Sequence, residues 1–409
     1  MNYLKNIVIL FSANSLGTLI NFISLPILTR IYSPEDFGLL AYFLSISLIF
    51  GMFLTLKFEN VFFIENNNIV EVYSLIIISI TLTSILSLIV LIFFWAINFL
   101  IKDFLLIPLL MVYIILLGFY YTGRAYSSSV GNFKKISKGY LVKIITQNLF
   151  FLIFGILFAP NYNYLLLGTV LGQLIETIIL NSNINLITIY KIINLNTIKE
   201  YFYRYINFPK FTLLGELIGN VNSQLPVFFL SNYFGNSVTG HYAMVQRLFA
   251  IPLKLLTSST AEAFRNEAAK LYSSEGSFKN LAIQTSKYLF IIAFVIGTLI
   301  IIVGDLFIPL FLGKNWLEAI PFLKVMIILF IFQFSISPIS YGLYISEKQK
   351  YDFYWQLSLF ITCLILLLIG VKYLDATKTI LLFNLGYSFM YIIYLFLIIS
   401  NSEKNNVIK

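Results

Sequence analysis

Long, uninterrupted runs of apolar residues recur along the whole chain. The segment from Ser74 to Phe94 (SLIIISITLTSILSLIVLIFF) is continuous rather than alternating. A transmembrane β-strand would alternate apolar and polar residues over about ten positions, whereas a membrane-spanning helix needs about 20 predominantly apolar residues. The pattern therefore predicts membrane-spanning helices, whose backbone hydrogen bonds are satisfied internally.

About 12 segments reach the length of a span. In chain order they are Asn6–Leu28, Phe37–Leu56, Tyr73–Leu100, Leu105–Tyr126, Leu141–Ala159, Tyr164–Tyr190, Phe211–Phe234, Gly240–Ala263, Tyr288–Leu312, Ile320–Ile345, Tyr354–Val371 and Thr379–Ser400. The segments that begin at Phe211, Gly240 and Ile320 are the least apolar. The stretch Ser258–Tyr272, with Glu, Arg and Lys among alanines, is expected to continue the eighth helix beyond the bilayer.

The composition supports this reading, because 59% of the residues are hydrophobic and only 11% are charged. A soluble domain carries about a quarter charged residues, so lipid must be the solvent for most of this surface. The one cysteine, Cys363, excludes an intramolecular disulfide. With one histidine, His241, and no grouped ligands, we expect no metal and no other cofactor. The first segment is too long for a signal-peptide core and is interpreted as a span.

The net charge of +9 would suit nucleic acid, but basic residues also collect in cytoplasmic loops of membrane proteins. We therefore placed the N-terminus in the cytoplasm and counted the 27 Lys and Arg residues. On the outer side fall Arg30, Lys102, Lys314, Lys324, Lys372 and Lys378. Arg247 falls inside a span, and the other 20 fall on the inner side. This asymmetry predicts that both termini are cytoplasmic, and no nucleic-acid partner is expected.

The two halves of the chain resemble each other. The order Phe11, Pro26, Tyr32 and Gly38 recurs as Phe211, Pro226, Phe234 and Gly240. Two parallel six-helix halves, residues 1–200 and 201–409, are a transporter architecture. Chance matching of so few residues is the alternative.

Local signals mark two turns at the outer side. Ser33, Pro34 and Asp36 predict a capping box with proline at the first helical position. Asn315 and Glu318 are expected to do the same in the second half.

Polar residues inside the spans normally face a cavity or another helix. Glu216, Asn220, Ser223 and Gln224 share one helical face, and so do Asn14, Thr18 and Asn21. The fifth and sixth spans add Gln147, Asn148, Gln173, Glu176 and Thr177. These faces suggest a hydrated central cavity, although hydrogen bonds between helices are an equal alternative for the neutral residues.

The cations are candidate substrate ligands. Arg247 is expected to be the only Lys or Arg within a span. In one interpretation it faces the cavity, with Arg30 at a comparable level in the other half. In the other interpretation it pairs with Glu216 and holds helices together. Lys57 and Arg124 lie at the inner ends of spans. They are either interface anchors in local salt bridges or part of the cytoplasmic mouth of the cavity.

Three motifs carry a family resemblance. Leu25–Gly38 (LPILTRIYSPEDFG) resembles the opening signature of the polysaccharide flippases of the multidrug/oligosaccharidyl-lipid/polysaccharide exporter superfamily. Thr55–Glu59 (TLKFE) is similar to a second family position usually written with Arg and Tyr, where Lys57 and Phe58 stand here. Gly313–Trp316 (GKNW) followed by Ala319 resembles a C-terminal pattern of the family.

The resemblance implies two six-helix lobes that form a V and alternate between inward- and outward-facing states. It implies an O-antigen- or capsule-type flippase of the bacterial inner membrane, which moves a polyprenyl-diphosphate-linked oligosaccharide from the cytoplasmic to the outer leaflet. Membrane lipid, a polysaccharide polymerase and chain-length machinery are the further partners implied. Cations suit the diphosphate, and Arg forks match phosphate geometry.

Two other classes stay open. A cation-coupled drug exporter of the same superfamily would use acidic cavity residues such as Glu176 and Glu216. A membrane polysaccharide polymerase would be an enzyme, but it would be expected to carry a large outer loop, which this sequence lacks. We therefore expect no enzyme activity.

The charge asymmetry makes a direct prediction about topology. In a Cys363→Ala background, a cysteine at Asn161–Asn163 should react with a membrane-impermeant thiol reagent in cells with a permeabilised outer membrane. A cysteine at Lys134–Lys138 should react only after the inner membrane is opened. Labelling of Lys134–Lys138 in intact spheroplasts would reverse the orientation.

Overall fold

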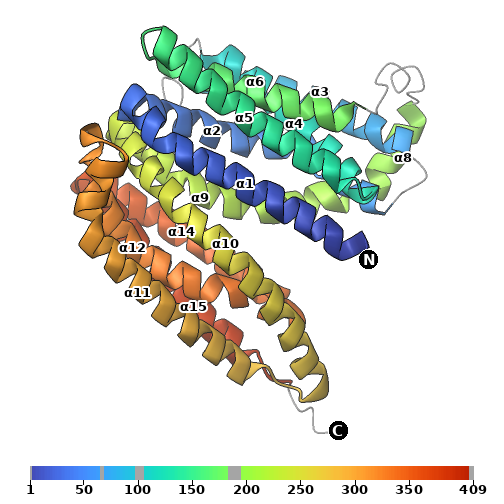
Figure 1. Ribbon diagram of the computed structural model, residues 1–409. Helices are drawn as coiled ribbons and strands as arrows, with labels where there is room; N and C mark the ends of the chain where they lie inside the picture. The colour runs from blue at the N-terminus through green and yellow to red at the C-terminus, as the bar shows by residue number, and fades with distance from the viewer. Residues whose placement is uncertain (1, 65–68, 97–105, 183–194, 405–409) are drawn as a thin grey trace. The chain divides into compact units, whose positions relative to one another are not determined.

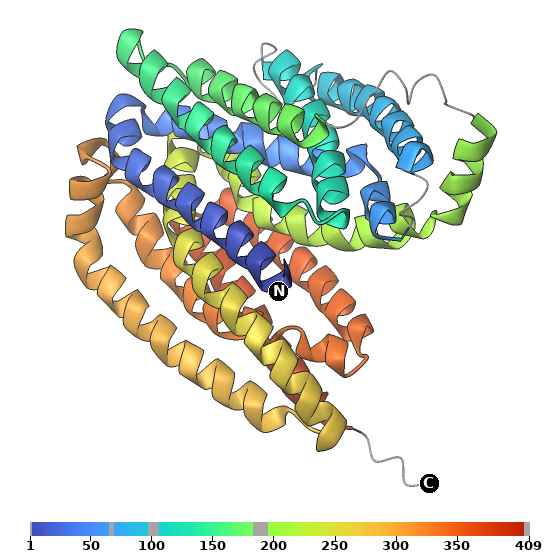
Figure 2. The same cartoon turned by 45° about the vertical axis from the view of Figure 1, so that its right-hand side comes forward.

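The computed structural model describes residues 2–64, 69–96, 106–182 and 195–404, and over these ranges the chain is almost entirely helical. Its contacts divide it into two compact units, Met1–Val221 and Asn222–Lys409. Figure 1 labels the helices, and Figure 2 shows them from a second side. Lys102, Lys191 and Lys409 of the charge count, and the expected span ends Leu100, Leu105 and Tyr190, lie outside the described residues.

The N-terminal unit contains the first six expected spans. Its elements are α1 (Asn2–Ile31), α2 (Pro34–Leu54), η1 (Phe58–Phe63), α3 (Ile69–Ala96), α4 (Leu106–Ser129), α5 (Phe133–Leu157), α6 (Tyr162–Asn181), α8 (Leu195–Arg204), η2 (Phe208–Thr212) and the start of α9 (Leu213–Tyr233). The contacts extend this unit beyond residue 200, where the repeat placed the boundary, because α8 packs on α3 and η2 on η1.

The C-terminal unit contains the end of α9 and the last five expected spans. Its elements after α9 are α10 (Asn236–Ser274), α11 (Lys279–Phe311), η3 (Lys314–Trp316), α12 (Ala319–Ile336), η4 (Ser337–Ile339), α13 (Gly342–Ile345), α14 (Gln349–Tyr373) and α15 (Ala376–Ser400). α10 has 39 residues, or about 58 Å at 1.5 Å per residue. It continues through Ser258–Tyr272 as one helix, as expected.

The two units share one packing pattern. In the first, α4 packs against α2, α3 and α6, and α6 packs against α5. In the second, α12 packs against α10, α11 and α15, and α15 packs against α14. The first helix of each unit also carries an internal proline, Pro26 in α1 and Pro226 in α9. These helix contacts recur in both units, and the division into two six-helix halves at residue 200 stays a prediction.

The fold class expected from the sequence is confirmed. Within the described ranges, nine helices are long and apolar enough to cross a membrane. The more polar α1, α9 and α10 have 30, 21 and 39 residues and complete the expected set of about 12. On α11, the side chains of Ile302, Leu306 and Leu310 are 69–71% exposed. Exposing such an apolar surface to water would be costly, whereas exposing it to lipid is not. The chain is a multi-pass, all-α membrane protein.

The capping box before α2 is also confirmed. The Ser33 hydroxyl accepts a hydrogen bond from the Asp36 backbone N–H at 3.2 Å, and the Asp36 carboxylate accepts one from the Ser33 backbone N–H at 2.9 Å. Pro34 occupies the first helical position, where its missing N–H costs nothing. Three residues therefore suffice to turn the chain between α1 and α2.

The corresponding expectation for the second half is wrong. Neither Asn315 nor Glu318 caps a helix with its side chain. The turn instead depends on Gly313, whose φ of 101° is in the region that glycine adopts without strain, and on the fully buried Trp316. Glu318 lies 3.4 Å from His241 Nε2, and Trp316 packs edge-on against the same imidazole.

The loop expected at Lys134–Lys138 is also shorter than predicted. α5 begins at Phe133, and the Asn132 side chain caps it by accepting a hydrogen bond from the Lys135 N–H at 3.2 Å. Gly131, with φ of 73°, completes the turn from α4. Lys134 and Lys138 remain exposed in the first turns of α5.

The capping box predicts a stability effect. Ser33→Ala combined with Asp36→Ala removes both cap hydrogen bonds and should cost about 0.5–2 kcal/mol of stability, the usual range for a lost N-cap. Thermal unfolding in detergent measures it, with Ser400→Ala at the exposed end of α15 as the control. Unchanged stability of the double variant would show that the cap does not hold this turn.

Candidate functional site

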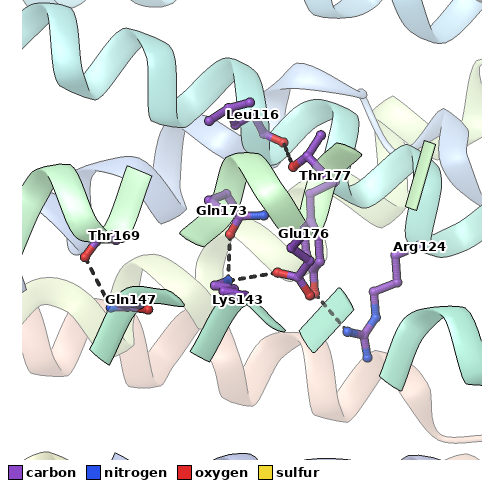
Figure 3. A network of polar contacts seen from close by, with 9 residues as sticks. Leu116, Arg124, Lys143, Gln147, Thr169, Gln173, Glu176 and Thr177 are labelled. Carbon is purple, nitrogen blue, oxygen red and sulfur yellow. Dashed lines mark hydrogen bonds and ion pairs between the residues drawn. The ribbon is translucent and has the colours of Figure 1, made fainter. Parts of the chain in front are cut away.

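A polar cluster lies inside the N-terminal unit, near the end where α4 and α6 finish and α5 begins. The short turn at Gly131 makes α4 and α5 antiparallel, so residues late in α4 and early in α5 come to the same level. Figure 3 shows side chains from α4, α5 and α6 converging there. The cluster is positioned by rigid helices rather than by loops.

An ion pair forms the centre of the cluster. Lys143 Nζ, on α5, lies 3.0 Å from Glu176 Oε2 on α6 and donates a hydrogen bond to Gln173 Oε1 at 2.6 Å (Figure 3). One helical turn further, Gln147 donates to Thr169 Oγ1 at 3.2 Å. The Glu176 side chain is 1% exposed and that of Lys143 is 20% exposed. The spacing of Thr169, Gln173 and Glu176 places them on one face of α6.

Lys57, which lies between α2 and η1, forms a second ion pair. Lys57 Nζ lies 2.6 Å from Glu216 Oε2 and 3.8 Å from Glu59 Oε1. Burial raises the pKa of the Glu59 carboxyl above its usual range, against the opposing charge of Lys57. Glu216 is therefore the main charge partner of Lys57. It comes from the first turn of α9, which belongs to the same unit.

The backbone around Lys57 is strained. Leu56 and Lys57 have φ values of 48° and 64°, in the left-handed region that residues with a side chain rarely adopt. Such strain persists where the surrounding structure over-determines it, and it concentrates at functional sites. Here the tight turn places the lysine side chain, only 11% exposed, inside the unit instead of in water.

Two adjacent tyrosines of α4 connect the ion pairs. The rings of Tyr120 and Tyr121 are 5.3 Å apart; Lys57 lies 5.8 Å from the centre of the Tyr121 ring and Lys143 5.6 Å from that of Tyr120. Arg124 donates a hydrogen bond to the Tyr120 hydroxyl at 2.8 Å. Lys57, Arg124 and Lys143, with the two tyrosines between them, therefore form one continuous group, which we call the cation cluster.

The sequence prediction found part of this cluster. It named Lys57, Arg124 and Glu216, and the structure brings these together. It missed the role of Lys143, which had been counted as a loop charge. Arg247 is therefore not the only cation within a span, since α5 carries Lys143 about ten residues from its start. The available signal was the i, i+4 spacing of Lys143 and Gln147, which places the lysine on the polar face of its helix.

The remaining candidates lie elsewhere. Asn21 on α1 accepts a hydrogen bond from Asn148 Nδ2 on α5 at 2.9 Å. Asn21 therefore makes a hydrogen bond between helices, which was the alternative to a side chain that faces the cavity. The Arg30 guanidinium donates to the Pro26 carbonyl on its own helix. Asn14 lies one turn before Thr18, whose hydroxyl donates to the Asn14 carbonyl.

The second-half candidates are on two helices. On α9, Asn220 Nδ2 donates to the Glu216 carbonyl at 2.9 Å, and Gln224 Nε2 donates to the Ser223 hydroxyl at 3.0 Å. Arg247 lies on α10 in the C-terminal unit. Glu216, once a candidate partner for Arg247, is paired with Lys57.

The site holds no metal-type cluster in the part of the chain that the structure describes: no three His, Cys, Asp or Glu side chains gather there. The chemistry that its residues offer is instead that of cations, amides and phenols within a helical bundle.

Comparison with known proteins assigns the family. Residues 27–321 match the model of a family described as polysaccharide biosynthesis protein. The chain belongs to this family. The capsular polysaccharide biosynthesis protein CapF of Staphylococcus aureus is 26% identical over 381 residues, which cover 89% of this chain and 90% of CapF. The teichuronic acid biosynthesis protein TuaB of Bacillus subtilis (strain 168) is 24% identical over 46% of this chain and 37% of its own length.

Solved structures of transporters share the fold of this family member. The lipid II flippase MurJ in an inward closed conformation aligns with a TM-score of 0.74 at 16% identity, over 95% of this chain and 87% of MurJ. An inward-facing multidrug resistance transporter of the MATE family, in the MOP superfamily, aligns with a TM-score of 0.66 at 13% identity, over 98% and 99%. The recognition from sequence motifs is thereby confirmed, and the fold is that of transporters.

The central ion pair predicts a specific stability effect. Lys143→Met would leave the buried Glu176 carboxylate without its cation, and breaking a buried pair from one side costs about 3–5 kcal/mol. Because Lys143 is one-fifth exposed, we expect a loss near the lower end, about 3 kcal/mol, by thermal unfolding in detergent.

Two comparisons control this measurement. Lys138→Met, at an exposed position of the same helix, should have little effect. Adding Glu176→Gln to Lys143→Met should recover much of the loss, because no charge is then buried alone. Equal stability of the Lys143→Met single variant and the unmodified protein would argue against a structural ion pair.

Proposed function

We propose that the protein is a flippase that moves a polyprenyl-diphosphate-linked oligosaccharide repeat unit from the cytoplasmic to the outer leaflet of the bacterial inner membrane, by alternating access. Membership of a polysaccharide biosynthesis family and a transporter fold support this proposal. The product would be a surface polysaccharide of the O-antigen or capsule type. The protein translocates its substrate and leaves it chemically unchanged.

The observation that carries the proposal is the cation cluster. A charge within a membrane protein is costly and is retained where it binds a substrate or ion. Lys57 and Lys143 each present an ammonium group, and Arg124 presents a planar guanidinium that suits two phosphate oxygens at once. A diphosphate, with adjacent anionic groups, matches several cations held close together on one side of a helical bundle.

The tyrosines suit the neighbouring sugar. Tyr120 and Tyr121 are partly exposed and offer apolar ring faces together with hydroxyl groups, the combination that amphipathic ligands use. A pyranose ring has one apolar face and a rim of hydroxyls, so it would fit beside them. The other sequence candidates, Arg30, Arg247, Asn14, Asn21, Asn220 and Gln224, are proposed as later contacts on the substrate's path.

The cluster would face the cytoplasm when the substrate enters. The positive-inside count predicts that the ends of α2, α4 and α6 lie on the cytoplasmic side, together with both termini. In the proposed direction of transport the repeat unit enters from that side, so its diphosphate would meet Lys57, Arg124 and Lys143 first. A polymerase and chain-length machinery would act on the product at the outer leaflet.

The test removes one ion pair without leaving a single charge behind. Lys57→Gln combined with Glu216→Gln, expressed in a strain that lacks the native gene, should abolish most surface polysaccharide at normal protein level. Complete lipid-linked repeat units should accumulate on the cytoplasmic leaflet, measured by extraction and mass spectrometry. The control is Lys324→Gln with Asp305→Asn, an exposed ion pair of the C-terminal unit at 2.7 Å.

Full export by the well-expressed Lys57 and Glu216 double variant would remove the cation cluster from the mechanism. Normal surface polysaccharide in the deletion strain, with a change in drug sensitivity instead, would favour the drug-exporter alternative.

A further inference from the structure

Two cations of the cation cluster share one aromatic ring. Lys143 Nζ lies 5.6 Å and the central carbon of the Arg124 guanidinium 5.9 Å from the centre of the Tyr120 ring. The two cations belong to different helices, α5 and α4. Because like charges repel each other, their separation depends on what holds these two helices in place.

Two side chains of α6 bind α4. The Thr177 hydroxyl donates a hydrogen bond to the Leu116 carbonyl at 3.3 Å (Figure 3). One turn further along α6, Asn181 Nδ2 donates to the Phe119 carbonyl at 3.1 Å. The two donors are one turn apart on α6 and the two acceptors one turn apart on α4, so both bonds form along the same helix–helix contact. Hydrogen bonds from Thr and Asn are used in this way to join helices in membranes.

Gly123 allows α4 and α6 to come close at the level of Asn181. A Cβ atom at position 123 would lie 2.7 Å from Asn181 Nδ2 and 2.9 Å from Asn181 Cγ. A larger residue would therefore displace the amide or separate the helices. Small residues have this role at close helix contacts in membranes. We call Gly123, Thr177 and Asn181 together the α4–α6 contact.

The α4–α6 contact lies directly beside the charged residues. Gly123 precedes Arg124 on α4, and Thr177 follows Glu176 on α6. Glu176 in turn pairs with Lys143 of α5 at 3.0 Å. Because α6 is joined to α4 by hydrogen bonds and to α5 by an ion pair, it determines the distance between the two cations.

We propose that Gly123, Thr177 and Asn181 are positioning residues of the cation cluster, an inference that rests on the proposed function. They act through Arg124, which they hold at the distance from Lys143 at which each cation meets a different phosphate of one diphosphate. A ligand with a single phosphate leaves one of the two cations without an anion. The α4–α6 contact therefore selects a ligand with two adjacent phosphates over a ligand with one.

The relative affinity for two probes measures this selectivity. The probes are farnesyl-diphosphate-linked and farnesyl-phosphate-linked N-acetylglucosamine, which share the lipid and the sugar and differ by one phosphate. Calorimetric titration of the full-length protein in lipid nanodiscs gives the ratio of the two affinities. We expect the unmodified protein to bind the diphosphate probe more tightly.

A substitution at Gly123 should change this ratio. Gly123→Ala should lower it about tenfold, the effect of losing one hydrogen bond to a charged group. Every cation remains in this variant, so a change in the ratio reports their positions and not their number. The matched control is Gly139→Ala on α5, which also faces α6. Its Cβ would lie 3.5 Å from Glu176 Cγ, an ordinary contact, so the ratio should stay unchanged.

A second pair of variants keeps the test decisive if Gly123→Ala does not fold. Thr177→Val removes the hydroxyl that donates to Leu116 and retains the shape of the side chain, so it should also lower the ratio. Thr177→Ser keeps the hydroxyl and should restore the ratio. A purely structural role would change thermal stability in detergent and leave the ratio of affinities as it is.

The outcomes separate this inference from the proposed function. An unchanged ratio in the folded Gly123→Ala or Thr177→Val variant would overturn the positioning role and leave the flippase proposal intact. Equal binding of the two probes by the unmodified protein would do the same. Absence of binding of either probe would overturn the proposed function and this inference with it.

Discussion

A charge inside a helical bundle surrounded by lipid is stable only beside an opposite charge or water, and this constraint organises the N-terminal unit. Lys143 on α5 and Lys57 after α2 each meet a carboxylate from another helix. These contacts bring α5 to α6 and η1 to α9. The ion pairs are thus polar contacts that join these elements of the unit.

The surrounding residues keep these cations inside. The left-handed backbone at Leu56 and Lys57 aims one lysine inward, and the long regular helix α5 carries the other well past its first turn. Tyr120 and Tyr121 fill the space between them with rings that tolerate a neighbouring cation. Removing either lysine would leave its carboxylate partner without an opposite charge.

The C-terminal unit repeats the helix packing with different polar chemistry. Its buried Asp352, on α14, accepts hydrogen bonds from Tyr394 at 2.5 Å, Gln356 at 2.8 Å and Tyr344 at 3.2 Å. Among the residues that the structure describes, these donors join α13, α14 and α15 through Asp352 with neutral groups only. Hydrogen bonds from neutral groups stabilise a fixed arrangement, whereas an ion pair has a cation that an incoming anion can attract. The N-terminal unit thus contains the pairs Lys57–Glu216 and Lys143–Glu176, whereas Asp352 of the C-terminal unit is held by hydrogen bonds from neutral groups.

Much of this protein was determined by its sequence alone. The number and order of the spans, the turn at Ser33–Asp36 and the polar faces of α6 and α9 follow from hydropathy and from contacts within four residues, which act locally. The same reasoning was wrong at Gly313–Glu318, because the buried Trp316 and the positive φ of Gly313 determine that turn. Only the tertiary structure decided which carboxylate each lysine meets. Lys143 and Glu176, like Lys57 and Glu216, are on different helices, and their pairing depends on how those helices pack and on how deeply each side chain is buried.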